Sequence, residues 1–311
     1  MINLVFTAIR TILWISERLM PSVGANVVLT LFSRPGIRPS NRKPSERLKR
    51  AAEILDGSER LDMQVRAFNQ ERRVRVYHWK AANPSAPKVL VVHGFDSGMR
   101  FLADFVPSLL EAGFEVMGLD LPGHGESEGK TVNYIWATES IQQVQRLYGT
   151  AYGIVGHSFG GAMSVLSSTG NPPTVEAIPV EKLVLIAAPN RLPNTLSRFR
   201  AQVGFGPRVD EAFRRKLARL GGRERADYGM DSNLAGSGIP TLVIHDRGDK
   251  EVPFTDAEEM SALAEVSVKP VEGWGHNRIL GAPEVIESSV EFLANTLPAE
   301  KREKVGVMVQ K

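Results

Sequence analysis

Two stretches near residue 60 alternate apolar and polar positions: LDMQVRAF at residues 61–68 and RRVRVYHW at residues 72–79. An alternation with a period of two is typical of a strand with one buried face. The pair therefore predicts two strands joined by a turn at residues 69–71. Continuous apolar runs, which are typical of strands covered on both faces, follow at residues 88–94, 114–119, 151–157, 182–189 and 241–246.

Segments with helical spacing separate these runs. These helical segments lie at residues 99–112, 132–148, 255–264 and 283–297 and directly after residue 158. A further short strand is expected at residues 266–273. Strands that alternate with helices predict an α/β fold with a mainly parallel central sheet and helices on both faces.

The first 60 residues follow a different pattern. An apolar run at residues 2–15 has helical spacing, is interrupted by Arg10 and is too short to cross about 30 Å of hydrocarbon. We expect Pro21 and Gly24 to end this helix. The sequence predicts an N-terminal helical extension at 1–60, the α/β domain at 61–297 and a C-terminal tail at 298–311. The extension either packs on the domain or anchors it at a membrane interface.

Composition and charge narrow the function classes. The 311 residues include no cysteine, which excludes disulfides and thiolate metal sites and fits a reducing compartment. The net charge of +3 is uneven: residues 34–50 hold seven basic residues and one acidic residue, and residues 191–225 hold ten and three. A basic tract beside an apolar helix suits an anionic membrane surface. We expect a cytoplasmic protein with weak membrane contact through residues 1–50 and no nucleic-acid partner.

The stretch GHSFG places Ser158 between an apolar run and a helical segment, with Gly156 and Gly160 two residues away on either side. Gly-x-Ser-x-Gly between a strand and a helix is the pattern of a nucleophile elbow. The serine takes strained backbone angles there, so its neighbours must be small. A phosphate loop is excluded because no Lys-Ser/Thr follows the glycines.

A nucleophilic serine needs a base and an orienting carboxylate. His276 lies in a loop after the last predicted strand, where the chain order of this elbow type requires the base. Asp249 follows the strand at 241–246 and is the expected acid, with Asp246 as the reserve. The other histidines are expected to be structural: His78, His93, His124, His157 and His245.

The third part of such a site holds the negative charge of the tetrahedral intermediate. Gly94, in VVHGFDSG, lets the backbone turn so that the amide of Phe95 points toward the serine. The amide of Phe159, directly after the serine, is the second expected donor of this oxyanion hole.

Five stretches in this order, HGFDSG, GLDLPGHGESEG, GHSFGG, IHDRGDKEVP and GWGH, resemble the α/β-hydrolase fold proteins of the monoacylglycerol lipase/serine aminopeptidase-like group. The resemblance covers residues 61–297. It implies Ser158 as nucleophile, Asp249 as acid, His276 as base and a small helical cap at about 190–238. We expect no cofactor and no metal.

Together these observations predict a serine hydrolase that cleaves carboxylic esters, either lipid-like or small acyl esters, through an acyl-enzyme. Two alternatives stay open. A thioesterase or peptidase would use the same residues, and a binding protein could retain the fold without catalysis.

Overall fold

The computed structural model describes residues 2–36, 46–171, 174–221 and 229–295. Its centre is an eight-stranded sheet in the order β1-β2-β4-β3-β5-β6-β7-β8. The strands are β1 (Glu59–Ala67), β2 (Gln70–Trp79), β3 (Lys88–Val92), β4 (Glu115–Leu119), β5 (Gly153–His157), β6 (Lys182–Ile186), β7 (Thr241–Asp246) and β8 (Val266–Val271). β1 and β2 are antiparallel, and β3 to β8 run parallel, as the continuous apolar runs predict.

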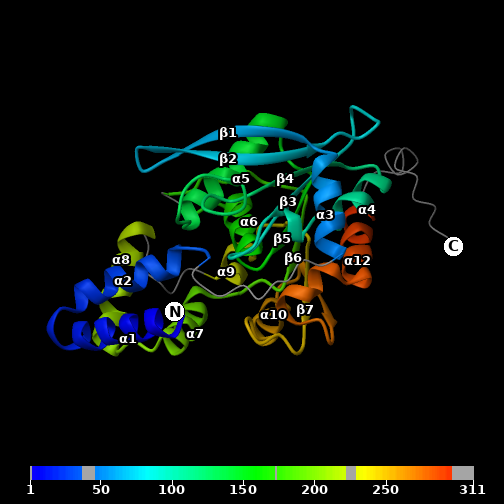
Figure 1. Ribbon diagram of the computed structural model, residues 1–311. Coiled ribbons are helices and arrows are strands. Elements are labelled where there is room, and N and C mark those ends of the chain that lie inside the picture. Colours follow the sequence, from blue (N-terminus) through cyan, green and yellow to red (C-terminus); the bar gives the residue numbers. More distant parts are fainter. Residues whose placement is uncertain (1, 37–45, 172–173, 222–228, 296–311) are drawn as a thin grey trace.

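Helices cover both faces of the sheet (Figure 1). α5 (Tyr134–Tyr148) and α6 (Phe159–Thr169) pack on one face. α3 (Glu46–Asp56), α4 (Phe105–Glu111) and α12 (Pro283–Ala294) pack on the other. The shorter helices α10 (Thr255–Met260) and α11 (Gly275–Arg278) flank β8. The predicted α/β architecture is therefore confirmed.

The turn between β1 and β2 differs from the expected one. Ala67 pairs with Gln70, so the connection has two residues, Phe68 and Asn69, and not residues 69–71. Both take positive φ angles, of 52° and 56°. A two-residue hairpin turn needs such angles to match the twist of its strands. The predicted strand included Phe68, although an apolar residue at this position breaks the alternation.

The predicted extension at 1–60 includes α3, which packs on the sheet, and begins with two further helices, α1 (Ile2–Leu19) and α2 (Pro21–Ser33). Pro21 begins the second helix, since proline is well accepted in a first helical turn. Gly24 lies inside α2, where an added Cβ would come within 2.7 Å of the Val209 side chain and 2.8 Å of Ser16 Cβ. The expectation that Gly24 ends a helix was wrong: it allows two helices to approach closely.

The cap helices are α7 (Leu192–Val203), α8 (Pro207–Gly221) and α9 (Met230–Leu234). α1 and α2 pack on α7 and α8 and form a lobe with them beside the sheet, whereas α9 packs on the sheet side (Figure 1). Apolar side chains from both parts share one buried cluster, which includes Leu13, Ala25, Val28, Leu196, Phe199, Val209 and Phe213. Packing on the domain, one of the two interpretations of the extension, is thus observed for its inner face.

Some of the predicted segments lie partly or wholly outside the described residues. The tail at 298–311 is one of them, and residues 37–45 of the first basic tract and 222–225 of the second also lie outside. The segment boundaries remain predictions. No helix in the described ranges combines the length and the hydropathy needed to cross a bilayer.

Candidate active site

Ser158 stands on the sharp turn from β5 to α6. Its φ of 51° and ψ of −121° are strained for a residue with a side chain. Its N–H donates to the carbonyl of Ile186 at 2.9 Å, which holds the turn against β6. A Cβ on Gly160 would lie 2.3 Å from the carbonyl oxygen of His93, and one on Gly156 would lie 2.6 Å from the Cα of Gly161. Neither Gly156 nor Gly160 could carry a side chain, because neighbouring backbone atoms lie too close.

His276 lies within hydrogen-bond distance of both expected partners. Its Nε2 is 3.0 Å from Oγ of Ser158, and its Nδ1 is 2.7 Å from Oδ2 of Asp249. A carboxylate only accepts, so Nδ1 carries the proton and Nε2 is free to accept from the serine hydroxyl. The structure brings together three side chains that are 118 and 27 positions apart in the chain.

The carboxylate of Asp249 is buried and accepts several hydrogen bonds. Its Oδ1 accepts from the N–H groups of Glu251 and Val252, at 2.8 and 3.0 Å. Burial alone would raise the pKa of Asp249, but hydrogen bonds from His245, His276 and the backbone outweigh it and hold that pKa well below its usual range. Asp249 is therefore a fixed negative charge beside the imidazole.

Asp246, the reserve candidate, serves a different role. Its Oδ1 accepts from the N–H of Gly248 at 2.7 Å, and its Oδ2 accepts from the N–H of Trp274 at 2.6 Å. The second bond ties the end of β7 to the loop that carries His276. Asp246 thus supports the backbone around the site, while Asp249 contacts the imidazole.

The predicted oxyanion loop lies against the elbow. A Cβ on Gly94 would come within 2.8 Å of Nδ1 of His157 and 3.0 Å of Cβ of Ser158. The Nδ1–H of His93 donates to the carbonyl of Gly94 at 2.7 Å, and its Nε2 accepts from the N–H of Leu121 at 2.9 Å. A trans peptide points its carbonyl and its N–H in opposite directions. His93 therefore sets the direction of the Phe95 N–H.

A protein-family model matches the part of the chain that forms this site. The model described as Alpha/beta hydrolase family matches residues 89–288, which run from β3 into α12. This chain belongs to the alpha/beta hydrolase family. The match includes Ser158, Asp249 and His276. The predictions of a hydrolase and of its fold class are confirmed.

Three similar proteins share low sequence identity with this chain. AB hydrolase superfamily protein YisY of Bacillus subtilis (strain 168) is 22% identical over 250 residues, 67% of this chain and 91% of that protein. Monoacylglycerol lipase ABHD6 of Bos taurus is 23% identical over 295 residues, 79% of this chain and 86% of that protein. The crystal structure of the esterase RhEst1 from Rhodococcus sp. ECU1013 covers 78% of this chain and 100% of its own, with a TM-score of 0.54 and 16% identity. Its likeness supports the shared fold.

Sequence reasoning about this alpha/beta hydrolase missed what two of its histidines do. His157 is buried, and its Nε2–H donates to the backbone carbonyl of His276 at 2.9 Å. His93 holds the Gly94 carbonyl, as described above. Both had been expected to be structural, and each holds the backbone of a functional position. The only signal in the sequence is that each lies within two residues of a predicted site residue.

Burial keeps several histidines of this hydrolase neutral. It lowers the pKa of His124 and of His157 to about 3 and also lowers that of His93. In the unfolded chain these side chains bind protons near pH 6.5. The unfolded state therefore holds more protons between about pH 6.5 and pH 3, and the folded state loses stability as the pH falls through that window.

We expect the free energy of unfolding to decrease steadily below pH 6.5. Each of the three histidines contributes up to about 1.4 kcal/mol per pH unit. Urea unfolding at pH 7.5, 6 and 5, followed by circular dichroism, measures this slope. The same midpoint at all three pH values would contradict the assignment of buried neutral histidines.

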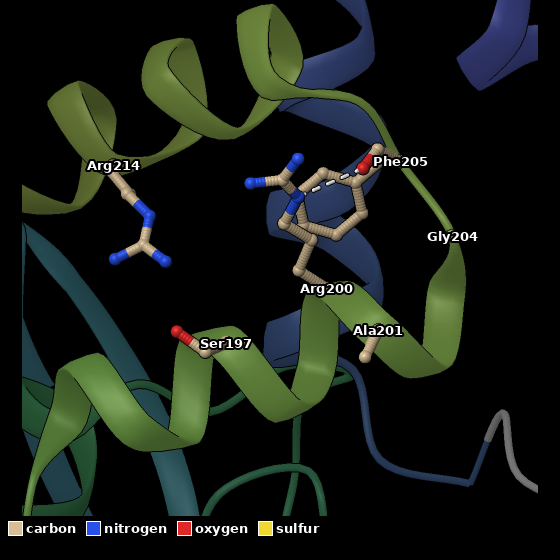
Figure 2. A pocket seen from close by; sticks show the side chains of 6 residues that line it. All are labelled: Ser197, Arg200, Ala201, Gly204, Phe205 and Arg214. Carbon is tan, nitrogen blue, oxygen red and sulfur yellow. Dashed lines mark hydrogen bonds between the residues drawn. The ribbon is translucent and has the colours of Figure 1, made fainter.

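A hollow of about 410 Å³ lies in the cap between α7 and α8 (Figure 2). Arg200 and Arg214 extend into it, and Asp210 pairs with both, at 3.3 and 2.7 Å. The side chain of Arg214 is only 11% exposed, and its partner Asp210 lies one turn earlier in the same helix. The six residues that line the hollow include no member of the Ser158 site.

Proposed function

We propose that this alpha/beta hydrolase is a serine hydrolase that cleaves carboxylic esters through an acyl-enzyme. The observation that carries the proposal is the chain of hydrogen bonds from Ser158 through His276 to Asp249. A serine activated by a neutral imidazole, which a carboxylate orients, is suited to attack a carbonyl carbon.

In the first half of the reaction, Oγ of Ser158 attacks the ester carbonyl and its proton passes to Nε2 of His276. The negative charge of Asp249 stabilises the imidazolium that forms. The N–H groups of Phe95 and Phe159 hold the oxyanion. His276 then gives its proton to the leaving alcohol, and Ser158 carries the acyl group.

Water completes the cycle. His276 removes a proton from a water molecule, which attacks the acyl carbonyl, and a second oxyanion forms beside the same two N–H groups. Its collapse returns the proton from His276 to Ser158 and releases the acid. No metal or cofactor is needed for any of these steps.

Lipid-like or small acyl esters are the proposed substrates. Two aromatic side chains, Phe95 and Phe159, meet edge to face beside Ser158, with ring centres 6.0 Å apart, and offer an apolar surface to an acyl chain. One of the relatives is a monoacylglycerol lipase. A cytoplasmic location with weak membrane contact through residues 1–50, and no nucleic-acid partner, completes the proposal.

Substrate panels separate the alternatives that share the triad. Hydrolysis of p-nitrophenyl esters across chain lengths is compared with hydrolysis of acyl-CoA thioesters and aminoacyl amides. We expect the highest kcat/KM for the esters. A preference for thioesters or amides would contradict the ester assignment, and no turnover together with no fluorophosphonate labelling would indicate a binding protein.

A further inference from the structure

Exposed hydrophobic side chains are concentrated on the extension. Nine large hydrophobic side chains are exposed in the described part of the chain, and six of them lie between residues 12 and 23. They are 42% to 72% exposed: Ile12, Trp14, Ile15, Leu19, Met20 and Val23. Scattered exposed hydrophobics are ordinary, but a cluster of this kind indicates a contact surface.

These six residues form one outer surface, which we call the hairpin face. Ile12, Ile15 and Leu19 have the spacing of one helical stripe, while Leu13 and Ser16 of the same helix are buried. Met20 and Val23 continue the stripe around the turn into α2. This turn lies at the edge of the lobe farthest from the sheet (Figure 1). The inner face of the hairpin already packs on the cap, so the outer face is not needed for the core.

The charges around the hairpin face favour one kind of partner. Arg10 and Arg18 are exposed, and the guanidinium of Arg18 lies 4.0 Å from the ring centre of Trp14. Glu17 is the only acidic residue of α1 and α2, and its two carboxylate oxygens accept the N–H groups of Arg208 and Val209 at 2.8 and 3.0 Å. The negative charge is therefore held at the start of α8, and the face is apolar with a cationic border.

We propose that the hairpin face is a docking surface for an anionic lipid bilayer. Apolar side chains of an interfacial helix bury into the boundary between headgroups and acyl chains, tryptophan is favoured at that depth, and arginines attract anionic headgroups. A second copy of the chain is a poorer partner, because a symmetric contact places Arg10 and Arg18 of one copy near those of the other. The surface deepens the proposed membrane contact through residues 1–50, and its docking does not depend on the catalytic proposal.

The far end of α2 connects this surface to the catalytic site. The carbonyl of Ser33 accepts the N–H of Val132 at 2.8 Å, and the N–H of Gly36 donates to Oδ1 of Asp96 at 2.5 Å. Asp96 directly follows Phe95 of the oxyanion loop. A bilayer held at the hairpin face is thus linked through one helix to the loop that faces the substrate carbonyl.

The test uses the full chain and co-sedimentation with vesicles of phosphatidylcholine alone or with about a third phosphatidylserine. The docking variant is Ile15→Ser/Leu19→Ser, and the matched control is Leu61→Ser/Leu147→Ser, which removes two exposed leucines far from the hairpin. We expect the parent and the control to bind the anionic vesicles and the docking variant to bind at least about tenfold more weakly. Arg10→Gln/Arg18→Gln should lose most of the difference between the two vesicle types, and added salt should do the same.

Three results would overturn the proposal. The first is equal binding of the parent to both vesicle types at low salt. The second is unchanged binding of the docking variant, with circular dichroism showing that it is folded. The third is a parent dimer that the docking variant converts to a monomer without any change in vesicle binding, which would make the face an interface between copies.

Catalysis is measured separately. Hydrolysis of a soluble short-chain ester should be the same in the parent and in the docking variant, because neither replaced residue belongs to the site. The Ser158→Ala variant should bind vesicles as the parent does. Failure of the proposed hydrolase function is thereby distinguished from failure of docking.

Discussion

Replacing Ser158 with alanine is expected to abolish ester hydrolysis while the protein stays folded. The hydroxyl is the proposed nucleophile, and loss of a triad serine typically lowers kcat by 10³-fold or much more. Alanine removes one oxygen from a partly buried side chain and leaves the backbone of the elbow in place. Initial rates with a p-nitrophenyl ester, together with fluorophosphonate labelling, measure the loss directly.

The matched control is Ser168→Ala on the same helix. Ser168 is buried, and its hydroxyl has no hydrogen-bond partner among the described residues. This variant should hydrolyse and label like the parent. Activity of Ser158→Ala within tenfold of the parent would show that another residue is the nucleophile.

Asp249→Asn is expected to lower kcat by about 10⁴-fold, the size of effect seen when an asparagine stabilises the wrong histidine tautomer. Oδ2 of Asp249 accepts the Nδ1–H of His276 at 2.7 Å, and an amide nitrogen at that position would instead present its own hydrogens. The base would then lose either its orientation or its free Nε2.

Asp246→Asn supplies the comparison, because it makes the same chemical change three residues away. Its carboxylate accepts from Gly248 and Trp274, so this variant should lose stability and retain far more turnover per folded molecule. The two variants are compared by active-site titration at equal folded fraction. A greater loss of kcat in Asp246→Asn would transfer the orienting role to Asp246.

Much of the fold was predictable because its signals are local. The buried parallel strands show as continuous apolar runs, and the elbow shows as glycines two residues from Ser158. The structure brings Ser158, Asp249 and His276 together as their order along the chain predicts. The roles of His93 and His157 were not predictable, since they depend on which carbonyl faces each ring in space. His157 contacts a carbonyl 119 positions away.

The errors in the prediction have physical causes as well. Pro21 and Gly24 were both expected to end the first helix. α1 does end at Leu19, just before Pro21, but Gly24 lies inside α2 and allows the contact with Val209. At Gly24 a contact between elements outweighs a local rule.

The shared cluster of the extension and the cap has a consequence for synthesis on the ribosome. The side chain of Val28 stays exposed until Leu196 and the rest of the cap have been synthesised, because those residues bury it in the folded protein. At ordinary elongation rates of 5–20 residues per second, this delay is roughly ten to thirty seconds. During that time α1 and α2 present apolar side chains on both their inner and outer faces. The nascent hairpin of α1 and α2 therefore exposes the most apolar surface before the cap has been synthesised. During this interval a chaperone or a lipid surface can bind it first.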